Sequence, residues 1–181
     1  MSDHTVWIVD FDVSLADAEP TAQRVLEHLV RIEVVQPHTF RLPYSCENLY
    51  LAGSKAQRYS EQVGECCGLL VEYGRNVYHS GCNGQVDTMP ALCPRCHTWH
   101  PAGRVAWLEA IQPWLDAVPG EGVLCPTCTR CSALEEWDFG EWGWAFGNLG
   151  FGFRNWPVQR KLAKELAAAS GHRMRIVYEC I

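Results

Sequence analysis

The sequence lacks any long hydrophobic run. None of its apolar stretches approaches the roughly 20 residues that a membrane-spanning helix needs. The N-terminal segment, Met1 to Asp10, also lacks the basic start, the apolar stretch and the small-residue cleavage site of a secretory signal. We therefore expect a cytoplasmic protein that is neither secreted nor membrane-bound.

Positive charge is scarce as well. The chain has 15 Lys and Arg residues against 21 Asp and Glu residues, which gives a formal net charge of -6. Non-specific binding to nucleic acid depends on clustered positive charge that neutralises phosphates, so we expect no generic affinity for nucleic acid. The hydrophobic share of 48% is that of a folded globular protein and argues against a disordered chain.

Several segments show a clear period of apolar residues. Val6 to Val9 predicts a buried strand, and Ala18 to Val30 predicts a helix because its apolar residues recur every three or four positions. Near the end of the chain, Pro157 predicts a helix start, Gly171 a helix stop, and Arg173 to Tyr178 a closing strand. We therefore expect an α+β fold with a small mixed sheet and flanking helices.

The chain length suits one domain with a substantial core. We expect residues 1–181 to form this single domain, with residues 91–137 inserted as a small metal-binding lobe. Residues 36–64 have no clear period and predict a loop with a short helix near its end, and residues 69–80 predict a β-hairpin. Residues 139–156 predict a pair of strands or an extended loop in which large rings pack where glycine leaves room.

The ten cysteines include two copies of one short motif. In a reducing compartment, cysteines serve as metal ligands or buried thiols rather than in disulfides. Cys93-Pro94-Arg95-Cys96 and Cys125-Pro126-Thr127-Cys128 are both C-P-x-C sequences. The two intervening residues let both sulfurs of a pair reach one ion in tetrahedral geometry. The motifs therefore predict one structural Zn²⁺ that is bound by the thiolates of Cys93, Cys96, Cys125 and Cys128.

Three neighbouring residues are alternative ligands. Cys131 extends the second motif to C-x-x-C-x-x-C, while His97 and His100 follow the first pair. Any of them could replace a thiolate, but we favour the interpretation that Cys131 is a small buried residue behind the site and that both histidines lie on the surface. Four thiolates saturate a tetrahedral ion and leave no position for water, so this set predicts a structural metal rather than a catalytic one.

Residues 91–137 resemble the zinc-ribbon and treble-clef families of zinc-binding modules. The resemblance rests on the two C-P-x-C motifs, and a helix expected soon after Cys128 favours the treble clef. These families often have glycine directly after the second cysteine of each pair, where φ tends to be positive, whereas this chain has His97 and Thr129. Because threonine tolerates a positive φ poorly, we expect the second motif to be distorted.

A different motif begins at the first predicted strand. Val6 to Asp17 resembles the first motif of haloacid-dehalogenase-type phosphatases, an apolar strand followed by D-x-D-x-[ST]-L. The resemblance implies Asp10 as the nucleophile and Asp12 as the general acid, with magnesium present. Val13 departs from the usual glycine of the family, and no later acidic pair suits magnesium, although phosphoryl transfer depends on that ion. A phosphatase is therefore an alternative and not the leading hypothesis.

The chain as a whole resembles a group of small bacterial proteins without an assigned activity. The resemblance rests on the W-I-V-D-F-D strand, the F-x-F-x-N-W-P segment and the turn at Gly171-His172. A saturated metal site, an acidic charge and the lack of a complete catalytic set lead us to expect a non-enzymatic interaction or regulatory protein. Its partner would be another protein, for example a basic toxin that an immunity-like protein neutralises. A nucleic-acid-binding zinc module is the remaining alternative.

Overall fold

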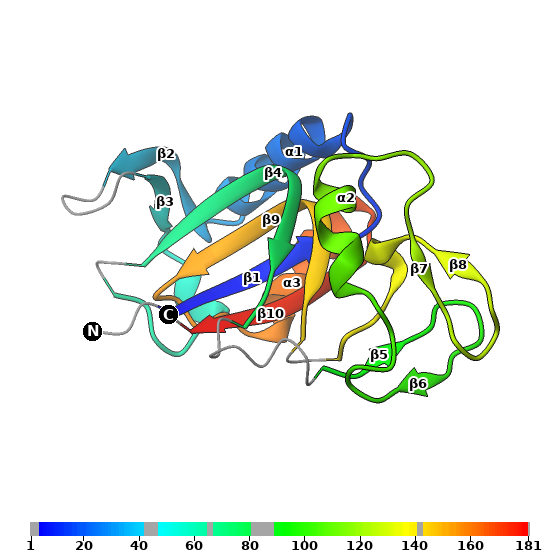
Figure 1. The fold of residues 1–181 in the computed structure, drawn as a ribbon. Helices are drawn as coiled ribbons and strands as arrows, with labels where there is room; N and C mark the ends of the chain where they lie inside the picture. Colours follow the sequence, from blue (N-terminus) through cyan, green and yellow to red (C-terminus); the bar gives the residue numbers. More distant parts are fainter. Residues whose placement is uncertain (1–3, 42–46, 65–66, 81–88, 141–142, 181) are drawn as a thin grey trace.

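A single curved sheet forms the body of the molecule (Figure 1). The computed structural model describes residues 4–41, 47–64, 67–80, 89–140 and 143–180. Within these residues, six strands lie in the order β10-β1-β9-β4-β3-β2. The strands are β1 (His4–Asp10), β2 (Val35–Arg41), β3 (Asn48–Ala52), β4 (Gly68–Tyr78), β9 (Ala145–Arg154) and β10 (Met174–Cys180).

The α+β class predicted from the sequence is confirmed. The sheet itself is antiparallel in every described pairing and is not mixed in strand direction as we expected. Parallel neighbours need a crossover between adjacent strands. The one helical crossover near the start of the chain leads from β1 to β2 at the far edge, so it places no parallel strand beside β1.

Two helices cover one face of the sheet. They are α1 (Ala18–Arg31) and α3 (Arg160–Ser170), and they contact each other. Alternate side chains of β1 point to opposite faces. Val6 and Ile8 join the main core beneath the helices, whereas Trp7 and Val9 join a smaller cluster on the other face.

The glycine-rich segment around residue 150 forms the central strand β9, which pairs with β1 on one side and β4 on the other. A Cβ added at Gly152 would lie 2.7 Å from the ring of Trp7, and one added at Gly150 would lie 2.4 Å from the hydroxyl of Tyr78. Large rings therefore fill the space above these glycines, as the sequence predicts. The segment forms one strand rather than a pair.

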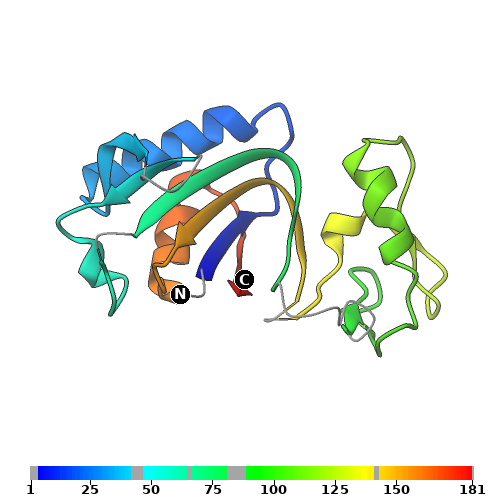
Figure 2. The ribbon, with the colours of Figure 1, turned by 60° about the vertical axis from the view of Figure 1, so that its left-hand side comes forward.

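Residues 91–137, which we call the lobe, lie beside the sheet, on the side away from the helices (Figure 2). They pack around a cluster of their own that includes Trp107, Trp114 and Trp137 and continues to Phe146 on β9. The elements of the lobe are β5 (Ala91–Leu92), β6 (Trp99–His100), η3 (Leu108–Ala110), α2 (Ile111–Leu115), β7 (Val123–Leu124), β8 (Cys131–Ser132) and η4 (Leu134–Glu136).

Three local predictions are wrong. The described part of residues 36–64 contains most of β2 and all of β3 instead of a loop, and a short 3-10 turn, η1 (Ala56–Arg58), lies where we expected a short helix. Residues 69–80 form no hairpin, because β4 pairs with β9 on both sides of a register shift between Tyr73 and Asn76. Helix α3 begins at Arg160 and not at Pro157.

A separate observation concerns membranes. Among the described residues, no helix combines the length and the apolar character that crossing a bilayer requires.

Candidate metal centre

Two hairpin turns bring the four cysteines together. The turn between β5 and β6 carries the first pair, and the turn between β7 and β8 carries the second. In each turn, the amide of the first cysteine donates to the carbonyl five residues later, at 3.0 Å in both cases. The amide four residues later donates back to the carbonyl of that cysteine, at 3.0 Å in the first turn and 2.9 Å in the second. The lobe thus contains the same cysteine-bearing turn twice.

The residue after each pair has a left-handed backbone. His97 has φ 55° and Thr129 has φ 57°, so the second turn is not distorted, and our expectation was wrong. A positive φ costs a β-branched residue about 1–3 kcal/mol. The hydroxyl of Thr129 donates to the carbonyl of Cys128 at 2.8 Å, which offsets part of this cost. The hydrogen bonds of the turn therefore determine the backbone even where the side chain opposes it.

The sulfur positions fit a single tetrahedral ion. The Sγ atoms of Cys93 and Cys128 are 3.8 Å apart, those of Cys96 and Cys125 are 3.7 Å apart, and all four lie within 4.8 Å of one another. A tetrahedral ion with metal–sulfur bonds of about 2.3 Å places its sulfurs about 3.8 Å apart. The four side chains could therefore hold one metal ion without a large rearrangement.

The thiols also influence one another electrostatically. A hydrogen bond with the side chain of Thr98 is the main cause that lowers the pKa of Cys96 to about 6. The amide of Arg130 lowers the pKa of Cys128, but burial and the neighbouring thiols outweigh it and raise this pKa to about 11. Four adjacent thiolates repel one another, so the fully ionised set requires a bound cation.

The three alternative ligands occupy different places. Cys131 is exposed and lies outside the group of four sulfurs, so it is not the buried residue that we favoured. His97 is also exposed. His100 is buried, and its Nε2 lies 3.3 Å from Sγ of Cys125. His100 is therefore a neighbour of a ligand and not a surface residue, which its position in the sequence did not reveal.

An arginine connects the two hairpins. Arg95, between the cysteines of the first pair, donates from Nε to Oγ of Ser132 at 3.0 Å. Its Nη2 lies 3.0 Å from Oε2 of Glu136 in an ion pair. Ser132 thus serves the contact between the hairpins. The second pair is followed by β8 and the short η4, with no α-helix of the treble-clef kind.

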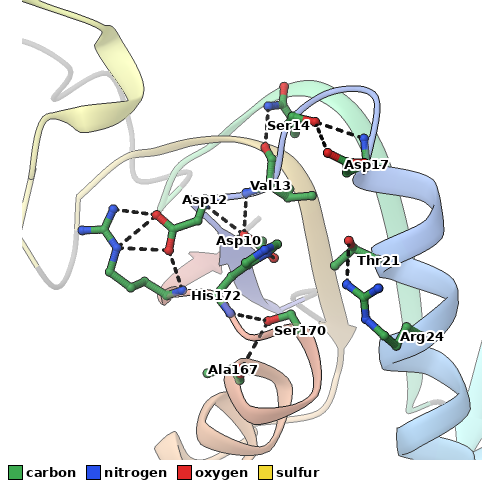
Figure 3. A network of polar contacts seen from close by, with 12 residues as sticks. Asp10, Asp12, Val13, Ser14, Asp17, Thr21, Arg24, Ala167, Ser170 and His172 are labelled. Carbon is green, nitrogen blue, oxygen red and sulfur yellow. Dashed lines mark hydrogen bonds and ion pairs between the residues drawn. The ribbon is translucent and has the colours of Figure 1, made fainter.

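Asp10 of the phosphatase-like motif is fully buried (Figure 3). Its Oδ1 accepts hydrogen bonds from the amides of Asp12 and Val13, each at 3.0 Å, and its Oδ2 lies 2.8 Å from Nδ1 of His172. Both carboxylate oxygens are therefore occupied, and solvent does not reach the group. A nucleophile must meet its substrate, so Asp10 serves the structure of the turn after β1.

Asp12 is likewise engaged. Arg173 donates to it from the backbone amide at 2.8 Å and from the guanidinium at 2.6–3.1 Å, and these bonds hold the pKa of Asp12 below its usual range. A general acid needs a raised pKa rather than a lowered one. In the described part of the chain, the four cysteines form the only cluster suited to a metal. The phosphatase alternative has no support.

Comparisons with known proteins add no assignment. No family model, no curated protein and no solved structure matches this chain. The resemblance to a group of small bacterial proteins therefore has no support. What the fold and the site define is an α+β protein with a four-cysteine centre suited to one metal ion.

Proposed function

We propose that this chain is a non-enzymatic interaction protein whose lobe is held together by one structural Zn²⁺. The observation that carries the proposal is the geometry of the four sulfurs, whose spacing fits a tetrahedral ion. Four thiolates fill the coordination shell and leave no position for a reactive water. The chemistry of the site therefore favours folding over catalysis.

Thiolate ligands favour soft or borderline metals. A tetrahedral set of four sulfurs suits zinc or an iron–sulfur centre, whereas magnesium and calcium prefer oxygen. Zinc carries no redox activity and has no geometric preference of its own, which suits a purely structural site. Iron is the competing occupant that a measurement must distinguish.

The lobe depends on such an ion. Its hairpins pair only two residues per strand, and isolated hairpins of this kind are at best marginally stable. Metal ligation links both turns through four bonds and supplies the free energy that the short strands lack. A rigid lobe beside the sheet is a suitable platform for binding another molecule.

Metal analysis of the purified protein tests the first half of the proposal. We expect about one zinc per chain by mass spectrometry of the native protein. After cobalt substitution, ultraviolet charge-transfer bands should show thiolate ligation, and intense visible d–d bands should show tetrahedral geometry. Iron in place of zinc, or less than a tenth of an equivalent of any metal after expression with added zinc, would contradict it.

Affinity capture from the source cells tests the second half. The zinc-loaded chain should retain a protein partner, and a Cys125→Ser variant should lose it because the lobe is no longer held. The exposed Cys131→Ser variant is the matched control and should retain the partner. A reproducible turnover of small substrates without any retained partner would sink the proposal of a non-enzymatic role.

A further inference from the structure

A cavity of about 650 Å³ runs along the free edge of the sheet, between α3 and the residues that join the lobe to β9. Five residues of the segment Arg173 to Tyr178 line it. The first turn of α3 contributes Arg160 and Ala163, and the lobe contributes Trp99. The volume lies within the range of sites that bind ligands.

The backbone of β10 faces this cavity. The amide of Phe11 donates to the carbonyl of Arg173 at 3.2 Å. Arg173 and every second residue after it therefore point their backbone amide and carbonyl groups toward β1. The amide of Asn155 donates to the carbonyl of His4, so His4 and every second residue after it on β1 form their backbone hydrogen bonds with β9. The residues between them are left to bond with β10, which is consistent with the Phe11–Arg173 bond. The backbone groups of Met174 and Ile176 therefore point outward into the cavity.

No described strand pairs with β10 on this side. An open edge is a template for another strand, and proteins usually cover it or interrupt it with proline or a bulge. The segment from Met174 to Cys180 contains no proline and keeps one register with β1 throughout. The edge is thus regular, and among the described residues no strand pairs with it at Met174 and Ile176.

Positive charge gathers at this edge, although the chain as a whole carries a net charge of -6. Arg160, Arg173 and Arg175 all line the cavity, and Asp138 is the carboxylate that lines it with them. Arg175 is held in place by an ion pair with Asp138 at 2.6 Å and lies over the ring of Phe11 at 4.6 Å. The side chain of Arg173 is 82% exposed, so its guanidinium is accessible to a ligand while it pairs with Asp12.

The two sides of the edge have different chemistry. The side chains of Met174 and Ile176 pack toward the helices, where Ala163 adds further apolar surface. Arg173 and Arg175 alternate with them and therefore point to the opposite face. Trp99 of the lobe is 51% exposed and lines the same cavity. An added strand would meet Met174, Ile176 and Ala163 on the helix-facing side, where Arg160 of α3 also lies, and the exposed guanidinium of Arg173 on the other side.

We propose that this edge binds an extended acidic segment of a partner protein, which adds to the sheet as a strand beside β10. The inference rests on the proposed function and names the chemistry of the partner. Backbone hydrogen bonds to Met174 and Ile176 supply affinity, and alternate side chains supply specificity. Acidic residues pair with Arg173, and apolar residues contact the helix-facing side of β10.

Two other occupants fit less well. A second copy of the chain, paired through β10, would bring two sets of three arginines together, and like charges across paired strands are destabilising. Single-stranded nucleic acid could meet the arginines and Trp99, but it offers no amide row for the edge of a strand. An acidic peptide satisfies both the backbone and the charge.

The experiment titrates the full zinc-loaded chain against a fluorescein-labelled peptide of about eight residues that alternates glutamate with valine, a length that spans the lined part of β10. Two N-methylated versions carry the methyl groups on alternate sets of amides. We expect one version to bind like the parent and the other to lose binding, because only one set of amides faces β10. A version with lysine in place of glutamate should bind at least about tenfold more weakly.

Protein variants report on the charges. Arg173→Gln and Arg160→Gln should each weaken binding about threefold or more, and Arg104→Gln, an exposed arginine that does not line the cavity, should leave binding unchanged. Hydrogen exchange should show new protection at the amides of Met174 and Ile176 when the peptide is bound. This readout does not depend on any substitution.

Several results would overturn the inference. Equal binding of the lysine peptide, binding of both N-methylated versions, or unchanged affinity in the two arginine variants would each exclude strand addition by an acidic segment. If a labelled oligonucleotide binds at this edge and the peptide does not, the occupant is a nucleic acid and the inference is wrong. If sedimentation shows a dimer that Arg173→Gln strengthens, the occupant is a second copy of the chain and the inference is likewise wrong. If the Arg173→Gln and Arg160→Gln variants still retain a cellular partner as the unaltered chain does, this edge is not the binding site. The proposed function would then still stand.

Discussion

His97 and His100 lie three positions apart but differ in role. His97 occupies the left-handed position after the first cysteine pair and is exposed. His100 is the last residue of β6, and the pairing of this strand with β5 turns its side chain inward toward Cys125. A nitrogen–sulfur contact of this kind orients the ligand and tunes the charge on the sulfur. The backbone, and not the residue type, separates the two roles.

His100→Phe should weaken metal binding by about 10–100-fold, as losses of groups that orient a ligand commonly do. The phenyl ring keeps the bulk beside Trp137 but has no nitrogen to contact Cys125. Competition with a chromophoric chelator measures the affinity. His97→Asn is the control, because asparagine tolerates a positive φ, and it should leave the affinity unchanged. Equal weakening in both variants would argue against a specific role for His100.

The exposed thiol and the clustered thiols should respond differently to serine. Cys125→Ser removes one of the four clustered sulfurs, so we expect the metal content to fall from about one per chain to near zero. Cys131→Ser should keep the full metal content, because its sulfur lies outside the cluster. Metal analysis after gel filtration gives both values. Loss of metal from the Cys131 variant would show that the ligand set includes this residue.

A half-buried carboxyl on β4, that of Glu72, is expected to destabilise the fold at neutral pH. Burial, and then the charges of Glu47 and Glu179, raise the pKa of Glu72 above the ordinary value of a glutamate. The folded chain therefore binds this proton more tightly than the unfolded chain, and folding stability falls as the pH rises through the raised pKa. We expect Glu72→Gln to stabilise the protein at pH 7 by about 1 kcal/mol or less.

The gain from Glu72→Gln should disappear below about pH 4, where the carboxyl is protonated in both states. Urea unfolding at several pH values measures it. Glu109→Gln, at an exposed position on η3, is the matched control and should show no such pH dependence. A loss of stability at neutral pH in the Glu72 variant would reverse the expected sign, and the hydrogen bond from Asn76 would then outweigh the cost of burial.

At the scale of single elements, the packing of β9 requires glycine at positions where large rings from neighbouring strands lie against its backbone. Paired on both sides, it carries Phe151 and Phe153 toward the helices and glycines toward the opposite face. Trp7 and Tyr78 occupy the space above these glycines. One face of the strand therefore presents bare backbone to the rings of Trp7 and Tyr78, and the other presents phenylalanine side chains to the main core.

Gly152→Ala should destabilise the protein by about 1–3 kcal/mol, because the new methyl group collides with the buried ring of Trp7. The ring cannot move freely, since its Nε1 donates to Glu179 at 2.7 Å. Gly64→Ala is the control, because no described residue other than its chain neighbours has an atom within 4 Å of the added Cβ. Thermal unfolding compares the two. Equal midpoints would mean that the sheet relaxes around the methyl group at little cost.

At the scale of the whole molecule, the two larger hydrophobic clusters of the described residues divide the structure. One lies between the sheet and the helices and includes Ile8, Leu29 and Phe151. The other surrounds the cysteines and reaches the sheet through Phe146. The four clustered cysteines belong to the second cluster alone. We therefore expect the ion to stabilise the lobe far more than the main core, although residues 1–181 form one chain with no separating linker in the sequence.

Removal of the metal should loosen the lobe and leave the sheet folded. After chelation, hydrogen exchange in residues 91–137 should accelerate strongly, while residues 147–154 of β9 should remain protected, because local unfolding follows the contacts that are lost. Mass spectrometry of exchanged peptides measures both regions at once. Simultaneous loss of protection in both regions would show that the lobe and the sheet unfold as one unit.

Local patterns in the sequence were sufficient for some elements. The helix at Ala18, the glycine stop at Gly171 and the strand at Val6 follow from apolar period and residue type, and the structure contains all three. The repeated C-P-x-C spacing likewise indicated which cysteines lie together, because two intervening residues constrain both sulfurs of a pair in any fold.

Only the tertiary structure decided the rest. The strand β2 has no alternating pattern, since six of its seven residues are exposed, so its pairing with β3 leaves no signal in the sequence. The register shift in β4 is set by β9, a partner that is far away in the chain. The burial of Asp10, the contact of His100 with Cys125 and the cavity along β10 all arise where distant segments meet. Spacing along the chain constrains neighbours within a turn, whereas contacts between distant segments depend on the packing of the whole sheet.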